Sequence, residues 1–368
     1  MMPVAAVLAV GALAGVSLAL AAQPAPDTAR QFLAASFRLT ASEFRALDER
    51  RPVARSLDAS DGREVATLGV IRLQVPAAFY AEQLRNIVDF KRTDAVLQIG
   101  MFGDPARVED AAGLTLDRGD VDQLRRCRPG DCKVQLSAEA IGRFRTEVPW
   151  DGPDAHAAAE RLMRELLVDL VGRYRVSGDQ ALMIYQDSNR PLSLADEFRA
   201  MMTSRPALLR ELFPLFHDYL LAYPRARPTG ATIEDVVYWS KEKMGPGTVV
   251  SVTHLSLATL HDAGPAAFAA TSKQIYSTHY FDSSLGLTIL VPDPARASAA
   301  YLVYVNRSRL DLLRGFWGGF KRAVIRSRTR GAIEANLVEA RDLAETRFRA
   351  RSTAPGASGL GPDRHDQH

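Results

Sequence analysis

The sequence predicts an α+β fold in which a curved antiparallel sheet grips a long C-terminal helix, with a mostly helical insertion. Three observations predict it. A β-rich run ends at Pro76 and passes into an amphipathic helix. β-Branched and aromatic runs separated by Gly/Pro turns fill the last third of the chain. From Leu310 to about Arg349 the sequence then reads as one helix, so the sheet and this helix should enclose a cavity.

The chain divides into four parts by composition. We expect a signal peptide at 1–22, a linker with short helices at 23–63, a main domain at 64–349 and a disordered tail at 350–368. The main domain contains the insertion, at about 105–232. Residues 3–22 are uncharged and end in small side chains, which predicts export and a periplasmic or secreted protein. No basic residue precedes this run, and about 20 apolar residues span a bilayer, so an uncleaved anchor is the alternative.

Charge and cysteine content narrow the class of protein. Lysine and arginine number 46 against 43 acidic residues, a net charge of +3 that excludes a general nucleic-acid binder. The two cysteines, Cys127 and Cys132, flank a Pro-Gly turn. In an oxidising compartment this spacing predicts a disulfide, with two free thiols as the alternative. No cofactor is expected.

The first two thirds of the chain alternate between short strands and helices. A strand near Glu64–Val75 leads through Pro76 into a helix, and Asp94–Phe102 returns to a strand. Residues 114–144 form a polar, turn-rich segment around the cysteines. The expected elements that follow are a helix at Asp154–Tyr174, a strand at Gln180–Gln186, a helix capped by Ser193, and a helix kinked at Pro214.

The last third is predicted to be a meander of strands. Within it, the run Ser272–Ser283 is unusual because neither alternating face is purely apolar. Such a strand is typical of a sheet that lines a ligand pocket, and an exposed sheet face is the alternative. The candidate pocket residues are Trp239, His254, Gln274, Tyr276, Thr278, His279, Tyr280 and Asp282, and alternation places the even-numbered members from Gln274 to Asp282 on one face.

A catalytic site is a second interpretation of the same region. His254 and His279, with Tyr276 and a carboxylate such as Glu234 or Asp282, could act as general acid and base if their strands are neighbours. Their spacing matches no metal signature, and no nucleotide-binding or nucleophile motif occurs. The charged run Trp239–Lys243 is expected to end a strand and enter a turn, with its charges at a solvated hairpin tip and an anion site as the alternative.

Basic and aromatic side chains alternate where the last helix begins. This pattern suits the headgroup level of an anionic membrane, although the aromatic residues could instead pack on the sheet. The candidate membrane-surface residues are Arg314, Phe316, Trp317, Phe320, Lys321 and Arg322.

Two segments carry a resemblance to a known family. GVIRLQVPAAFYAEQLRNIVDFKR, residues 69–92, and the closing stretch 301–345 resemble the START/polyketide-cyclase-like (SRPBCC) helix-grip superfamily. The resemblance implies a sheet and helix around an apolar tunnel that binds lipids, sterols or polyketides, and it implies no catalytic residue. The helical insertion and the export signal depart from the family pattern.

Together these observations predict an exported binding protein for a hydrophobic or lipid-like ligand at the cell envelope, with an anionic membrane surface as a further partner. An enzyme of hydrolase or cyclase type that uses His254 and His279 is the first alternative. The second is an envelope interaction protein without a small ligand.

Overall fold

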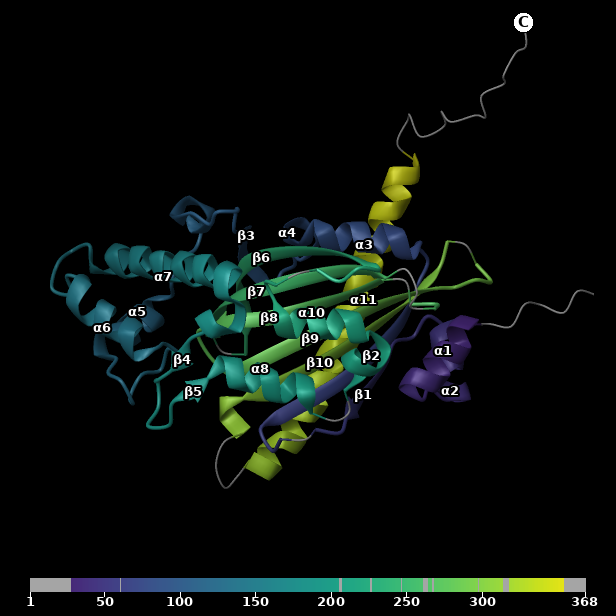
Figure 1. The fold of residues 1–368 in the computed structure, drawn as a ribbon, viewed down its shortest axis with the longest axis horizontal. Helices are drawn as coiled ribbons and strands as arrows, with labels where there is room; N and C mark the ends of the chain where they lie inside the picture. Colours follow the sequence, from purple (N-terminus) through teal and green to yellow (C-terminus); the bar gives the residue numbers. More distant parts are fainter. Residues whose placement is uncertain are drawn as a thin grey trace, which may run out of the picture.

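The computed structural model describes residues 28–59, 61–204, 207–225, 227–245, 247–260, 264–266, 268–296, 298–313 and 318–353. For residues 318–323 it describes the backbone but not the side chains. In this part of the chain an eight-stranded antiparallel sheet forms the centre, in the order β1-β2-β10-β9-β8-β7-β6-β3 (Figure 1). The strands are β1 Val53–Leu57, β2 Glu64–Leu73, β3 Val96–Met101, β6 Ala231–Met244, β7 Gly247–Leu260, β8 Phe268–Ser277, β9 Phe281–Pro292 and β10 Ala300–Leu310.

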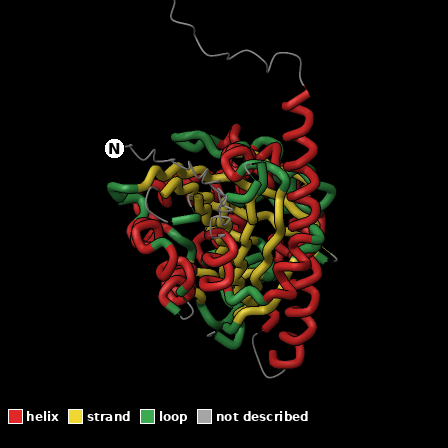
Figure 2. Tube along the Cα trace, turned by 90° about the vertical axis from the view of Figure 1, so that its right-hand side faces the viewer, coloured by secondary structure: helices red, strands yellow, loops and turns green. Residues whose placement is uncertain are grey.

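One face of the sheet is covered by the long helix α11, Gly318–Thr353, which lies alongside the strands in Figure 2. Gly69 of β2 permits the close approach, because a Cβ atom there would stand 2.7 Å from both Ile333 and Leu337 of α11. Helices α3, Ala77–Arg85, and α4, Ile87–Phe90, share the hydrophobic core on this face. The expected grip of the sheet on the closing helix is therefore confirmed.

The opposite face carries the other helices in two apolar clusters, apart from α11 (Figure 1). One cluster joins the strands to α5–α7 and the other to α1, α2 and α8–α10. A separate two-stranded ribbon, β4 Ile184–Tyr185 with β5 Leu192–Ser193, lies in the insertion. The helices are α1 Thr28–Phe37, α2 Ala41–Asp48, α5 Arg118–Arg126, α6 Ala138–Glu147, α7 Ala155–Ser177, α8 Leu194–Thr203, α9 Leu208–Leu212 and α10 Pro214–Ala222, with short 3-10 helices at Val108–Ala111, Gly178–Ala181 and Asp311–Leu313.

Several local predictions are confirmed. The apolar stripe expected on the helix near 154–174 is the buried side of α7. Ser193 caps α8, and its hydroxyl accepts a hydrogen bond from the amide of Asp196 at 3.3 Å. The kink expected at Pro214 is a break between α9 and α10, because proline starts a new helix after Phe213.

Other local predictions are wrong. The strand expected at Gln180–Gln186 is reduced to the two residues of β4, and β1 adds a sheet strand inside the segment predicted as a linker. Trp239–Lys243 ends β6 beside the turn as expected, because β6 and β7 pair as far as Met244 and Gly247. Two of its charges are not solvated as expected: Lys241 is buried and pairs with Asp117, and Glu242 pairs with Lys91. Long-range pairing decided each case.

Some predictions fall on parts of the chain that the structure leaves out. The signal peptide at 1–22 lies outside the described residues, as does the tail from 354 onward. The same holds for Arg314, Phe316 and Trp317, and for the side chains of Phe320, Lys321 and Arg322. Among the helices that are described, none combines the length and the hydropathy needed to cross a membrane.

Candidate functional site

A cavity of about 550 Å³ lies between the sheet and α11, where the sequence predicted one. Strands β2 and β6–β10 form its floor, α11 forms one wall, and Lys91, at the C-terminal end of α4, stands on another. Apolar and polar side chains share the lining. The apolar and aromatic members are Val65, Tyr238, Met244, Val249, Phe281, Tyr304, Leu310, Ala332 and Ile333; the polar members are Lys91, Glu242, Ser251, Thr253, Ser272, Gln274, Ser284, Asn306, Ser308, Arg328, Thr329 and Asn336, and Gly286 completes the set.

A β-bulge decides which residues of β8 reach this cavity. Thr253 of β7 pairs with Gln274, whereas the next pair is Val252 with Tyr276, so Ile275 is an extra residue on β8. Gln274 consequently faces the cavity, and Ile275 and Tyr276 both face the opposite core. The strict alternation expected over 272–283 is wrong for this reason, and also because β8 ends at Ser277.

Two hydrogen-bonded chains line opposite sides of the cavity floor. On β9 and β10, the Ser284 and Ser308 hydroxyls lie 2.8 Å apart, Ser308 donates to Asn306 Oδ1 at 2.9 Å, and Asn306 donates to Tyr304 at 3.3 Å. These hydrogen bonds hold the four side chains in defined orientations.

On β6 and β7, Ser240 donates to Glu242 at 2.6 Å and lies 3.2 Å from the Ser251 hydroxyl. Glu242 also forms an ion pair with Lys91. This second chain ends in two charges that compensate each other.

The Lys91–Glu242 pair is charged over a wide pH range. Burial would raise the pKa of Glu242, but the charge and hydrogen bond of Lys91 and the bond from Ser240 hold this pKa below its usual value. Burial would lower the pKa of Lys91, but Tyr238 and Glu242 outweigh it and raise this pKa. Burial also raises the pKa of Tyr238 and of Tyr304, so both phenols keep their protons.

Gln274 lies on β8, between the strands that carry the two chains. Its Oε1 atom is buried and accepts no hydrogen bond from any residue that the structure describes. A buried carbonyl oxygen without a partner costs roughly 1–3 kcal/mol. Gln274 therefore carries an unsatisfied acceptor among the residues that line the cavity.

A second hollow of about 190 Å³ adjoins the cavity. The two share Tyr304, Ile333 and Asn336. The rest of its lining is mainly apolar: Tyr80, Thr288, Leu302, Leu337 and Ala340. Apolar surface thus predominates in both parts of the space under α11, and the larger part also carries most of the polar side chains.

Of the eight predicted pocket residues, only Gln274 lines this cavity. Trp239 and Tyr276 belong to the core on the opposite face, where the Trp239 indole donates to the Asp110 carbonyl at 2.9 Å. The Tyr276 hydroxyl meets Met163 Sδ at 3.8 Å.

His254 also faces away from the cavity, in a buried polar network. Its Nδ1 lies 2.9 Å from the Tyr174 hydroxyl and its Nε2 lies 2.9 Å from Asp235 Oδ1. Ser256 donates to the same carboxylate oxygen at 2.6 Å. Burial lowers the pKa of His254, although Asp235 opposes this shift. Asp235 takes the place that the sequence analysis gave to Glu234 or Asp282.

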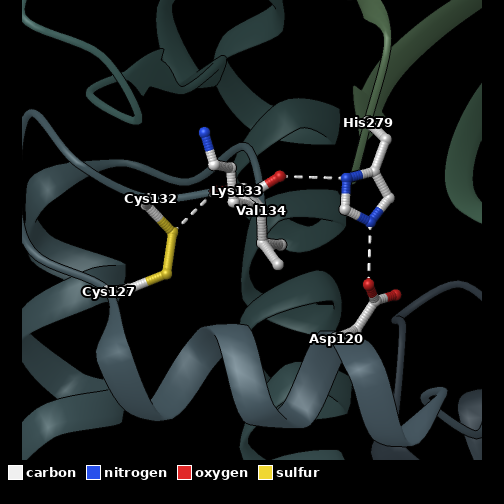
Figure 3. Close-up of a disulfide and its surroundings, with 6 residues drawn as sticks. All are labelled: Asp120, Cys127, Cys132, Lys133, Val134 and His279. Carbon is white, nitrogen blue, oxygen red and sulfur yellow. Dashed lines mark hydrogen bonds and ion pairs between the residues drawn. A yellow bond between two sulfur atoms is a disulfide. The ribbon is translucent and has the colours of Figure 1, made fainter.

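Of the remaining candidates, Thr278, His279 and Tyr280 form the turn between β8 and β9, and Asp282 is the second residue of β9. Thr278 accepts a hydrogen bond from the Val250 amide at 3.0 Å, Tyr280 has a φ of 67°, and Asp282 pairs with Arg63. His279 contacts Asp120 Oδ1 at 2.9 Å and the Lys133 carbonyl at 3.0 Å (Figure 3). All four contribute to the structure of the turn.

The predicted disulfide between Cys127 and Cys132 is confirmed. Figure 3 shows it beside the segment that His279 contacts, so the cross-link and the histidine hold the same loop near α5.

The residues of the predicted catalytic site each contact different partners. His254 meets Tyr174 and Asp235, His279 meets Asp120, and Tyr276 meets Met163. No cluster of His, Cys, Asp and Glu suited to a metal ion occurs among the described residues.

Sequence reasoning missed most of the cavity lining. One signal was available on β10, where alternation places Tyr304, Asn306 and Ser308 on one face of the strand. The Lys91–Glu242 pair gave no signal, because its members are far apart in the sequence.

Comparison with known proteins gives no relative. No family model, no curated protein and no solved structure matches this chain.

Proposed function

We propose that this protein is an exported binding protein for a lipid-like ligand, held between the sheet and α11 and exchanged at or near a membrane surface. The observation that carries the proposal is the cavity of about 550 Å³ beneath α11. Small-molecule sites in proteins have volumes of roughly 300–1,000 Å³ and combine apolar walls with a few placed polar groups. The lining described above has this character, which favours a ligand over the alternative of an interaction protein without one.

Export is supported by two features. The apolar run at 3–22 is typical of a signal peptide, and the Cys127–Cys132 disulfide is compatible with an oxidising compartment. A ligand of limited solubility in such a compartment needs a carrier between membranes or enzymes.

Docking to an anionic membrane is supported by the charge near the start of α11. Arg328 and Arg330 are exposed, and Arg328 also lines the cavity. Val324 and Leu312 expose 42% and 48% of their surface nearby in the sequence. Basic groups beside apolar ones favour an anionic bilayer surface, so the ligand would enter where the protein meets the membrane. The membrane-surface residues predicted from 314 to 322 belong to the same segment.

Catalysis by His254 and His279 has no specific observation in its favour, because each histidine already has its own partners on the face away from the cavity.

A cavity-filling variant tests the proposal. Ser272→Trp places an indole in the cavity, and Val176→Trp, at a position 78% exposed, is the matched control. Native mass spectrometry and titration with a panel of single-chain amphiphiles should show binding to the wild type and the control, and at least tenfold weaker binding to Ser272→Trp. Equal binding to both variants, or no binding to the wild type, would refute the proposal.

Membrane docking is a separate measurement. Flotation with vesicles of anionic phospholipid should retain the protein, and vesicles of zwitterionic lipid should not. Arg328→Ser/Arg330→Ser should weaken the retention; equal flotation of this variant would show that α11 does not carry the docking surface.

A further inference from the structure

We propose that the ligand carries an uncharged, hydroxyl-rich head group, of the sugar or polyol class, that binds across Lys91, Glu242 and Gln274. This inference rests on the proposed binding function and specifies the chemistry of the ligand's polar end.

The argument starts from the donors and acceptors that the cavity presents. Lys91 only donates hydrogen bonds, whereas Glu242 and Gln274 Oε1 accept them. In the structure Lys91 donates to Glu242 Oε1, which also accepts from Ser240. A hydroxyl group both donates and accepts, so vicinal hydroxyls can bind next to each of these groups.

Charge compensation argues against an ionised head group. Lys91 and Glu242 neutralise each other, and Arg328, the remaining charge of the described lining, is exposed to solvent that screens it, so neither sign is favoured beside the Lys91–Glu242 pair. A carboxylate would lie beside Glu242, and it has no donor for Gln274 Oε1. An ammonium group could donate to that oxygen but would lie beside Lys91. A charge buried next to a like charge is strongly disfavoured, and a neutral hydroxyl avoids the cost.

The uncharged side chains of the lining extend the same chemistry. Hydroxyl and amide groups from four neighbouring strands face the space around Gln274: Ser251, Thr253, Ser272, Ser284, Asn306 and Ser308. The rings of Tyr238 and Tyr304 stand among them. A sugar ring has polar edges and apolar faces, which match hydroxyls beside aromatic rings.

The adjoining hollow accounts for the other end of the ligand. Its lining is mainly apolar and it opens at Tyr304, where the two spaces share residues. Burial of alkyl groups there contributes about 0.8 kcal/mol for each methylene. The geometry thus fits a glycosylated or polyol-headed amphiphile, with the head on β6–β10 and the tail along Leu302 and Leu337.

A panel of octyl compounds with different heads tests the inference on the full chain. Isothermal titration below the micelle concentrations would compare octyl β-glucoside, octanoate, octyltrimethylammonium and octanol. We expect the glucoside to bind at least tenfold more tightly than the two ions. Tighter binding of either ion, or equal affinity for all four compounds, would overturn the inference while leaving the binding function in place. Failure of every compound would refute both.

Free maltose distinguishes the two sources of a hydroxyl-rich group. If the ligand is a glycolipid, as the apolar hollow indicates, maltose should bind at least tenfold more weakly than the octyl glucoside. Equal or tighter binding of maltose would overturn the lipid part of the inference and identify a soluble saccharide.

Two residues of β8, Gln274 and Thr271, supply a matched pair of variants. Gln274→Leu removes the acceptor in the cavity, and Thr271→Val removes another buried unpartnered oxygen that does not line the cavity. Loss of one hydrogen bond should weaken glucoside binding about fivefold to tenfold in Gln274→Leu, with octanol unchanged. Thr271→Val should bind both compounds as the wild type does. An unchanged glucoside affinity in Gln274→Leu would overturn the role of this residue, and Gln274→Met serves if the leucine variant does not fold.

Discussion

The two faces of the sheet bury polar side chains in different ways. Lys273 and Gln274 are neighbours on β8 and illustrate the difference. Lys273 points into the helix-covered face, where it is 2% exposed and paired with Asp179. Gln274 lines the cavity under α11, and its buried Oε1 atom has no partner among the described residues. The buried charge of Lys273 thus has a partner inside the protein, whereas the buried oxygen of Gln274 has none among the described residues.

This contrast also separates stability from function. A charge sealed in a packed core must be matched inside the protein, because water cannot reach it. A polar group that lines a cavity can be matched by water or ligand, so its loss should alter binding more than folding. The following predictions test this comparison, from the largest expected effect to the smallest.

The largest effect is expected on the packed face. Asp179→Ala leaves the buried Lys273 ammonium without its partner and should lower the free energy of unfolding by about 3–5 kcal/mol, measured by urea denaturation. The double variant Lys273→Met/Asp179→Ala removes both charges and should recover most of this loss. If the double variant were as unstable as the single one, the ion pair would not be the cause.

The next largest effect on the free energy of unfolding is expected at the contact of α11 with the sheet. Gly69→Val places side-chain atoms against Ile333 and Leu337 and should cost about 1–3 kcal/mol in unfolding free energy. The control is Gly172→Ala in α7, where a Cβ would meet no atom within 4 Å, and it should be neutral or slightly stabilising. A similar loss in both variants would show that close approach at Gly69 is unimportant.

A smaller, pH-dependent effect is expected at His279. Burial would lower its pKa, but the hydrogen bond and charge of Asp120 raise it above the usual value of about 6.5. The His279–Asp120 interaction therefore stabilises the fold fully at pH values below the usual histidine pKa, and this stabilisation is lost as the pH rises through the pKa of His279 in the folded state. His279→Gln should cost about 1–2 kcal/mol more at pH 5 than at pH 9, measured by urea unfolding at each pH.

Asp120→Asn should reproduce the pH dependence of His279→Gln, because both variants remove the same interaction. Equal costs at pH 5 and pH 9 in either variant would contradict the assignment.

The smallest effect on folding is expected in the cavity. Gln274→Leu breaks no hydrogen bond of the oxygen atom that the structure leaves unpartnered, so its unfolding free energy should not fall more than about 0.5 kcal/mol below that of the wild type. A loss above 2 kcal/mol in urea denaturation would show that this face is closed by its own contacts, as the packed face is.

The sequence predicted the fold well where local pattern and tertiary environment agree. The stripe on α7, the cap at Ser193 and the closing helix all follow from spacing or from one side chain beside its own backbone. The predicted pocket was less accurate. Its residues were chosen by strict alternation along 272–283, and one bulge at Ile275 moved Tyr276 to the other face.

The chain by itself determined the class of fold, the helix that crosses the sheet and the disulfide, because each depends on periodicity or on residues a few positions apart. Only the tertiary structure decided which side chains share the space beneath α11. Lys91 and Glu242 are 151 positions apart and meet because α4 is packed beside β3, the edge strand that pairs with β6. A bulge and a long-range ion pair depend on how strands pair and helices dock, and those energies belong to the assembled sheet and not to any segment of the sequence.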